Sequence, residues 1–226
     1  MKGAGPLEIN RLLGAYEQSS DDAAGMALVA ALQESKAAKA LRPEMVQPKL
    51  TKFSEKVRRA AEPLLASLGG DVADQRKHLE ELVKTLPPGD VRRGQVVFNG
   101  KQAACATCHA IGYIGGHVGP DLTRIGGVRA ERDLLESIVY PSASFVQSYE
   151  PVLVDTKGGD RQSGILKKND ADEVVLITGP EQETRIARSD VTEMRPSPVS
   201  VMPAGLDQQL TKQDLADLVA FLRACK

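Results

Sequence analysis

The chain has 226 residues, of which 42% are hydrophobic, and its 29 lysines and arginines almost balance its 30 aspartates and glutamates. This length fits one large domain or two small domains with a linker, and the hydrophobic share is sufficient for a buried core. The formal net charge of −1 gives no reason to expect a polyanionic partner such as nucleic acid, or a role at a membrane surface.

The N-terminal segment, residues 1–87, predicts short amphipathic helices. Pro63 lies inside one apolar periodicity and should kink or split that helix, and the glycine pair at 69–70 should end it. Asp71 is placed to cap the next helix. Paired helices of this kind predict a HEAT-like segment or a plain helical bundle. No residue here indicates chemistry, and His78, among charged neighbours, is expected at the solvated surface.

A second domain is predicted over residues 88–226, where the composition changes after a pair of prolines. Its first helix begins after Asp90, a capping residue, and contains Gly94, which costs about 1 kcal/mol relative to alanine in a helix interior. A glycine at this position makes sense if another helix crosses closely there. The C-terminal helix is the expected partner, and Thr211 with Asp214 resembles a capping box at its start.

The segment at about 148–197 changes to short β-like apolar runs separated by turn sequences. Four or five short strands predict a small antiparallel sheet or barrel inserted into the second domain. The insertion has 7 basic and 10 acidic residues, which disfavours nucleic-acid binding. The fold class predicted for the chain is therefore mainly α with a β insertion.

The most specific motif is Cys-Ala-Thr-Cys-His at residues 105–109, the attachment signature of a c-type haem. Each cysteine can add across one vinyl group of the same porphyrin, and His109 then directs a ring nitrogen at the iron. The alternative interpretation is half of a zinc site, but zinc needs four ligands. The other soft ligands of the chain form no second pair: Cys225, His78 and His117.

A second axial ligand is predicted at Met202, because a thioether opposite the histidine closes the iron and raises its reduction potential. Pro203 and Gly205 hold this stretch out of regular structure, so it can lie across a porphyrin face. Two rivals are weaker. Met194 falls in a predicted strand, and His117 is too close to the motif to reach the opposite face.

Residues 89–147 and 198–226 resemble class I cytochromes c. The β insertion makes the chain similar to the haem-binding domain found at the C-terminus of large exported proteins of planctomycetes and verrucomicrobia. In those proteins, helical repeats precede the cytochrome, and a dehydrogenase module often precedes the repeats. The matching pieces are the helix with Gly94 and Phe98, the motif at 105–109, Gly119-Pro120-Asp121-Leu122, Val201-Met202-Pro203 and the final helix.

The resemblance implies a class I cytochrome c fold with one covalent haem c. Its thioether anchors and axial ligands would be four side chains: Cys105, Cys108, His109 and Met202. The resemblance also implies that the Pro120 carbonyl accepts a hydrogen bond from the ring N–H of His109, which fixes the tautomer of the ligand. Leu122 and Phe98 would pack on the haem.

The function expected from these residues is one-electron transfer rather than enzymatic catalysis, because the iron does the redox work and no acid, base or nucleophile is needed. The partner would be a redox protein or a dehydrogenase module, in cis or in trans. One alternative is a haem peroxidase or gas sensor in which Met202 is a labile ligand. Another is a partner-binding adaptor in which the haem serves only to stabilise the fold.

Thioether attachment of haem normally follows export, so a periplasmic or otherwise exported location is expected. The first 22 residues lack the apolar run of a signal peptide. We therefore expect the chain to be a mature segment or a fragment of a longer exported protein. No apolar run approaches the roughly 20 residues of a membrane span, so no transmembrane segment is expected within the chain.

Overall fold

The computed structural model describes residues 9, 12–16, 19–35, 38, 41–68 and 72–226. Its helices and 3-10 turns are α2 (Asp22–Gln33), α3 (Pro43–Val46), η2 (Gln47–Leu50), α4 (Glu55–Ser67), α5 (Val72–Thr85), α6 (Val91–Asn99), η3 (Cys105–Thr107), α7 (Ile125–Val128), α8 (Glu131–Val139), η4 (Arg188–Asp190), η5 (Leu206–Gln208) and α9 (Lys212–Ala224). Its strands are β1 (Ala110–Ile111), β2 (Ile114–Gly115), β3 (Pro151–Thr156), β4 (Arg161–Asn169), β5 (Glu173–Gly179), β6 (Gln182–Ala187) and β7 (Val191–Pro196).

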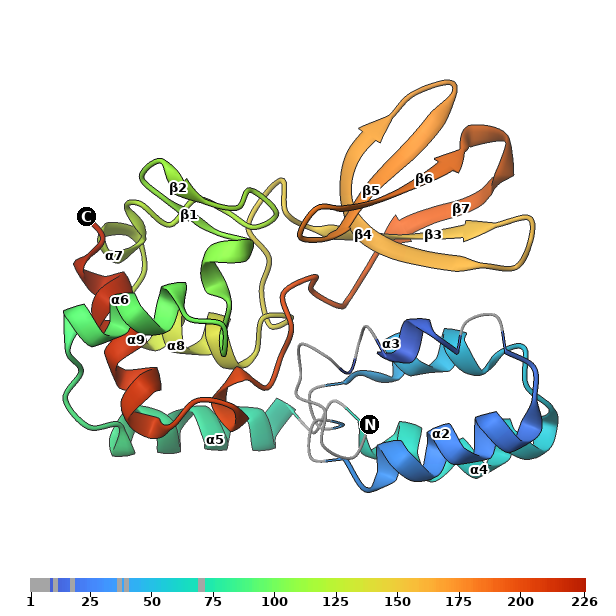
Figure 1. The fold of residues 1–226 in the computed structure, drawn as a ribbon, viewed down its shortest axis with the longest axis horizontal. Helices are drawn as coiled ribbons and strands as arrows, with labels where there is room; N and C mark the ends of the chain where they lie inside the picture. The colour runs from blue at the N-terminus through green and yellow to red at the C-terminus, as the bar shows by residue number, and fades with distance from the viewer. Residues whose placement is uncertain (1–8, 10–11, 17–18, 36–37, 39–40, 69–71) are drawn as a thin grey trace.

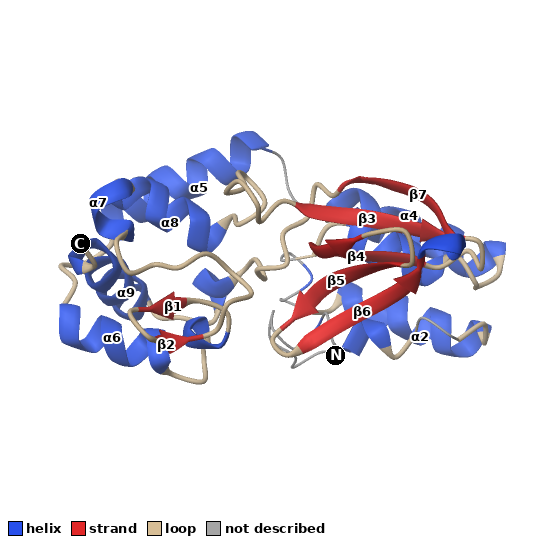
Figure 2. Cartoon of the chain, turned by 90° about the horizontal axis from the view of Figure 1, so that it is seen from above, coloured by secondary structure: helices blue, strands red, loops and turns tan. Residues whose placement is uncertain are grey.

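Three groups of elements are visible in Figure 1: the helices α2 to α4, the helices α5 to α9, and the sheet of β3 to β7. Each group has its own cluster of buried apolar side chains. The sheet lies against the first helical group, as Figure 2 shows from above. At this contact, Nζ of Lys52 lies 3.3 Å from a carboxylate oxygen of Asp160.

The prediction of a mainly α fold with a β insertion on a cytochrome c domain is wrong, because the chain is a mixed α and β protein. Strands account for about 18% of the described residues. The sheet is antiparallel with the order β6-β5-β4-β3-β7, and its buried residues form a core separate from that of the helices. Since Val154, Val174 and Leu176 are fully buried within it, the segment is a structural layer in its own right.

The first helical group is organised by close packing of α2 on α4. Asp21 caps α2, and its carboxylate accepts hydrogen bonds from the next helical amides. Gly25 permits the contact, because a Cβ there would lie 2.8 Å from side-chain atoms of Phe53 and Val57. The side chains of Phe53 and Val57 are buried in the resulting core.

Of the two outcomes predicted for Pro63, a kink or a split, the split does not occur, because α4 continues through the proline to residue 67. The proline lies on the exposed side of the helix, where water can satisfy the carbonyl that loses its amide partner. The predicted stop at 69–70 and the predicted cap Asp71 lie outside the described residues.

Helix α5 packs with the C-terminal helices. Leu79 and Leu82 belong to the same buried cluster as Phe98, and Glu80 forms a 3.0 Å ion pair with Arg132 of α8. The element that the sequence places before the second domain therefore contributes directly to the core around the motif.

The second helical group is built on the crossing of α6 and α9. Asp90 caps α6, and Thr211 and Asp214 form the predicted capping box of α9. A Cβ on Gly94 would lie 1.9 Å from the carbonyl oxygen of Asp217, so the two backbones touch. The prediction that this glycine serves a close helix crossing is confirmed.

Candidate functional site

The motif at residues 105–109 forms one tight turn. The amides of Cys108 and His109 both donate to the carbonyl of Cys105, at 3.1 and 3.0 Å. Ala104, just before the turn, adopts a left-handed conformation with φ 49°. Since side chains three residues apart on a 3-10 turn project from the same side, this turn presents both thiols together. They are free cysteines rather than a disulfide.

Both thiols of the motif are partly buried, and this sets their protonation. Burial raises the pKa of Cys105 to about 11. Burial also raises the pKa of Cys108, although a hydrogen bond from the Thr107 hydroxyl acts in the opposite direction. At neutral pH both side chains are therefore neutral thiols. This disfavours a dithiol redox centre, whose attacking cysteine needs a lowered pKa.

The ring of His109 is oriented by one hydrogen bond. Its Nδ1 lies 2.8 Å from the carbonyl oxygen of Pro120, which can only accept, so Nδ1 carries the proton. Burial lowers the pKa of His109, while this hydrogen bond opposes the effect. The imidazole is thus neutral, and Nε2 has a lone pair. Among the described residues Nε2 has no hydrogen-bond partner.

Glycines of the following loop contact the motif directly. A Cβ on Gly119 would lie 2.4 Å from Cε1 of His109, so the ring rests on the backbone of residue 119. A Cβ on Gly116 would lie 2.0 Å from the carbonyl oxygen of Thr107. The amides of both glycines donate back to the turn, at 2.9 Å to Ala106 and 2.8 Å to Cys108. These two glycines therefore let the loop pass close to the motif itself.

Met202 lies in an irregular segment before η5, as the prolines and glycine around it predicted. It is partly buried and packs against the same core cluster that Cys105 contacts. Met194 instead belongs to β7 and packs against the core of the sheet, in agreement with the predicted strand. His117 is exposed on the glycine-rich loop. Of these candidates, only Met202 shares its cluster with the motif.

Phe98 and Leu122, the two residues expected to pack on a haem, lie near the motif. Phe98 is 2% exposed, and the centroids of its ring and that of Phe221 are 5.6 Å apart. Leu122 is partly buried against the same cluster, and its amide donates to the carbonyl of Ala110 at 2.8 Å. Both side chains therefore belong to the apolar wall from which the motif projects.

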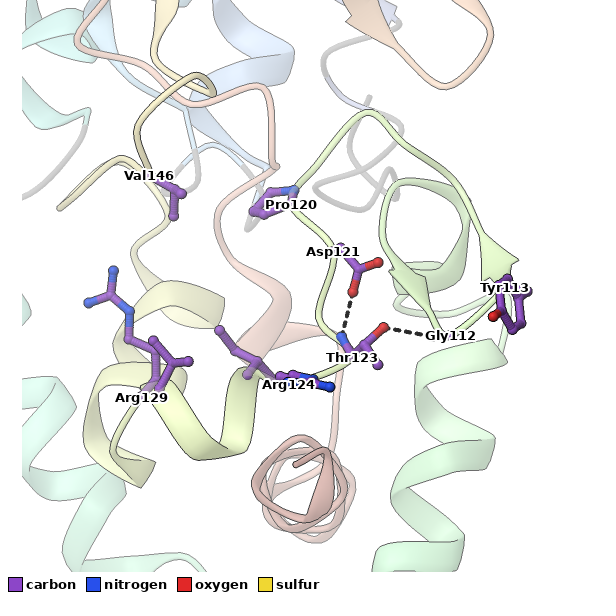
Figure 3. A pocket seen from close by; sticks show the side chains of 10 residues that line it. Gly112, Tyr113, Pro120, Asp121, Thr123, Arg124, Arg129 and Val146 are labelled. Carbon is purple, nitrogen blue, oxygen red and sulfur yellow. Dashed lines mark hydrogen bonds between the residues drawn. The ribbon is translucent and has the colours of Figure 1, made fainter.

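An open pocket of about 690 Å³ lies on the side of the 120–125 loop, with Pro120 at its edge (Figure 3). Its size falls in the range of small-molecule sites. Arg124 and Arg129, which both line it, have no ion-pair partner among the described residues. The lining residues are Gly112, Tyr113, Pro120, Asp121, Thr123, Arg124, Ile125, Val128, Arg129 and Val146.

No protein-family model matches the chain, and no curated protein matches it either. The geometry of the site is therefore what supports a function. None of the helices in the described part of the chain is long and apolar enough to cross a membrane.

The side chains around the motif fit a covalently attached haem. Two neutral thiols project from one turn, and the adjacent neutral imidazole is held through Nδ1 by Pro120, while its Nε2 has no partner in the part of the chain that the structure describes. The donor set does not fit zinc, because within the described ranges no three His, Cys, Asp or Glu side chains converge to hold a metal ion. Cys225, the third thiol, lies at the end of α9, away from the turn.

The sequence alone did not identify Gly119 as the support of the histidine ring. A glycine in a glycine-rich loop carries no local signal for the side chain that it faces, because that contact is set by the fold. The signal that was available is that the two residues are adjacent: Gly119, which supports the ring, directly precedes Pro120, whose carbonyl accepts the hydrogen bond from Nδ1–H.

Proposed function

We propose that this chain is an electron-transfer protein that carries one covalently attached haem c. The observation that carries the proposal is the state of His109: the ring is neutral, it is oriented through Nδ1 by Pro120, and its Nε2 has no hydrogen-bond partner in the described ranges, beside two protonated thiols. A histidine held in this way is prepared to bind a metal through Nε2, since a bond at the other nitrogen fixes the tautomer and raises ligand basicity.

Each side chain of the site has a distinct task in this proposal. Cys105 and Cys108 would form the two thioether bonds, and their shared turn fixes the distance between the two sulfurs. His109 and Met202 would be the axial ligands. When bound, the haem supplies a one-electron iron couple, and a His/Met ligand pair favours electron transfer over ligand binding. Because no substrate bond is made or broken, no catalytic residue is assigned and the chain is not an enzyme.

The surrounding protein limits the access of water and adds positive charge. Phe98 and the buried leucines of the cluster form an apolar wall on one side of the motif. Burial in such a wall lowers the local dielectric constant and so tunes a reduction potential. The neighbouring pocket is accessible to solvent, and its two arginines, which form no ion pair with any residue that the structure describes, are placed to pair with anionic groups. This open side is where we place contact with a redox partner.

The proposal includes export, because thioether attachment of haem normally takes place outside the cytoplasm. The expected partner is a redox protein or a dehydrogenase module, in the same or another chain. Weak redox encounters generally bury less than about 1,200 Å² in total. The helical and β layers that precede and follow the motif would then position the electron carrier relative to that partner.

The test is production of the chain with an export signal in a host that matures c-type haems. We expect the intact mass to increase by that of one haem, and the reduced protein to show the split visible bands of low-spin haem c. Cys105→Ser and Cys108→Ser should each remove one thioether bond, and the double variant should carry no covalent haem. Cys225→Ser is the matched control and should retain full haem content.

A separate variant tests whether Met202 is the second axial ligand, which is the sixth ligand of the iron. Met202→Leu preserves the size and the apolar character of the side chain but removes the sulfur. We expect the ferrous variant to become high-spin and to bind carbon monoxide readily, whereas the control Met194→Leu should behave as the unmodified protein. A wild-type protein that is already high-spin and binds carbon monoxide avidly would favour the gas-sensor alternative. Absence of covalent haem from matured wild-type protein would refute the proposal.

A further inference from the structure

Three polar side chains from distant parts of the chain meet beside the methionine segment, defined here as residues 198–206. Nδ1 of His78, on α5, lies 2.6 Å from the hydroxyl of Tyr140 at the end of α8. Nε2 of the same ring lies 3.8 Å from a carboxylate oxygen of Asp207, in η5. His78 is thus not the purely solvated side chain that its charged neighbours predicted, since both of its nitrogens face polar groups.

The carboxyl group of Asp207 is buried and has few polar neighbours. Its side chain is only 9% exposed, and within the described part of the chain the ring of His78 is the one basic group within 4 Å of it, a contact that is an ion pair only when the imidazole is protonated. Burial raises the pKa of Asp207, and a protonated His78 would act in the opposite direction. Burial, together with Asp207, also raises the pKa of Tyr140 to about 12, so its hydroxyl remains protonated and can donate. A buried carboxylate with one partner depends strongly on that partner.

The position of Asp207 in the chain gives this cluster its importance. Gly205 adopts φ 80° and turns the chain into η5, where Leu206 is buried. Asp207 therefore fixes the C-terminal end of the methionine segment. The N-terminal half of the segment is tied by the amide of Ser200, which donates to the hydroxyl of Ser142 at 3.0 Å. Ser142, just after α8, thus holds the N-terminal half of the segment directly, and Tyr140 acts on the C-terminal end through His78.

We infer that His78 is a positioning residue for Met202: together with Tyr140 it holds Asp207, and through it the methionine segment, against α5 and α8. The inference rests on the proposed function, because only an iron ligand requires this placement of residue 202. It means that α5, which lies outside the portion resembling a cytochrome, is part of the apparatus that sets the sixth ligand. A separate haem unit beginning at residue 88 would lack this support.

The experiment compares three side-chain variants in the full chain. His78→Phe keeps an aromatic ring but removes both polar contacts, and Asp207→Asn and Tyr140→Phe each remove one partner at nearly constant shape. His78→Gln, which keeps a hydrogen-bonding group, is the conservative rescue. Tyr149→Phe, at a partly buried tyrosine outside the cluster, is the matched control. The readouts are amide hydrogen exchange across residues 198–210 and, in the haem-loaded protein, the sulfur-to-iron charge-transfer band.

We expect His78→Phe and Asp207→Asn each to speed exchange in the methionine segment about tenfold, since each removes the polar contact between the His78 ring and the buried Asp207 carboxyl, and His78→Phe also removes the hydrogen bond to Tyr140. The sulfur–iron band should weaken in parallel, and His78→Gln should restore part of both signals. In a double-mutant cycle, His78→Phe combined with Asp207→Asn should cost less than the sum of the single effects. Tyr149→Phe should change neither readout.

Failure of this inference can be distinguished from failure of the proposed function. If no haem attaches to the wild-type chain, the function fails, yet hydrogen exchange still tests whether His78 holds residues 198–210. If haem attaches with a normal sulfur–iron band, and His78→Phe changes neither the band nor the exchange, His78 is not a positioning residue. A uniform increase in exchange over the whole chain would also overturn the inference, because it would show a general loss of stability.

Discussion

A Cβ atom on Gly94 would lie 1.9 Å from the carbonyl oxygen of Asp217. The side chain of Asp217 faces the same crossing, where its carboxylate accepts from Nε of Arg93 and from the amide of Asp90, each at 2.6 Å. One residue of α9 therefore meets α6 by direct backbone contact and by a polar network. This double contact fixes the two helices that support the motif.

Gly94→Ala should destabilise the protein, although alanine is normally the better helix former. The added methyl group meets backbone rather than a flexible side chain, so α6 and α9 must separate. We expect a loss of about 1–3 kcal/mol in the free energy of unfolding, typical of overpacking. Urea denaturation measures it, with the exposed Gln95→Ala in the same helix as control. A gain in stability would show that the helices do not touch at this point.

Asp217 should make stability depend on acid pH. Its hydrogen bond with Arg93 lowers the pKa of this buried carboxyl to about 2. The unfolded chain, with a pKa near 3.9, binds the proton first. The stabilisation is therefore complete above about pH 4 and is lost as the pH falls towards 2.

Asp217→Asn should lower the free energy of unfolding by about 2 kcal/mol at pH 7. This is less than the loss expected when a fully buried ion pair is broken, because Arg93 is largely exposed. Urea denaturation from pH 2.5 to 6 measures how the free energy of unfolding of each protein changes with pH. The difference between wild type and variant should shrink on acidification, whereas the exposed Asp74→Asn should stay parallel to wild type. A difference that does not vary with pH would mean that the carboxylate charge has no role.

Local signals in the sequence predicted the helix caps at Asp90 and Thr211 and the close crossing at Gly94, and the structure confirms them. Caps and helix spacing are encoded within a few residues. The place of the sheet in the fold was not predictable in the same way, because the pairing of β3 with the edge strand β7 joins residues about 40 positions apart. A strand pattern read locally gives the strands but not the core that they enclose.

In the candidate site, too, some features follow from local sequence and others depend on the tertiary structure. The motif turn and the irregular methionine segment follow from cysteine spacing and from proline and glycine content. The support of the His109 ring by Gly119, and the cluster of His78, Tyr140 and Asp207, required the tertiary structure. For His78, charged sequence neighbours predicted solvent, but the partners of the ring come from other elements, which no local pattern contains.

The thiol of Cys105 should react unusually slowly in chain produced without haem. Burial raises its pKa to about 11, so the thiolate fraction at pH 8 is small. Alkylation by iodoacetamide, followed by peptide mass spectrometry, should accelerate about tenfold per pH unit from pH 7 to 9.5, without the levelling expected of an ordinary thiol near its pKa of about 8.5. In denaturant all three cysteines should react alike. Rapid labelling of the folded chain at pH 7 would contradict the buried neutral thiol.

Gly119→Ala tests the orientation of the proposed ligand without removing it. The backbone at residue 119 is acceptable to alanine, because its φ lies outside the left-handed region, but the new methyl group would lie 2.4 Å from Cε1 of His109 and 2.7 Å from Nδ1. The ring must therefore move and weaken its hydrogen bond to Pro120. Loss of such a supporting contact typically costs about 10- to 100-fold in metal affinity or activity.

We therefore expect the matured Gly119→Ala protein to retain both thioether bonds while its histidine–iron bond weakens. The mass should still show one haem, but the ferrous spectrum should shift from low-spin towards a mixture. Gly127→Ala is the matched control, since nothing lies within 4 Å of its added Cβ, and it should keep the wild-type spectrum. If Gly119→Ala also keeps that spectrum, the contact between residue 119 and the imidazole does not hold the ligand, and the orientation must depend on Pro120 alone.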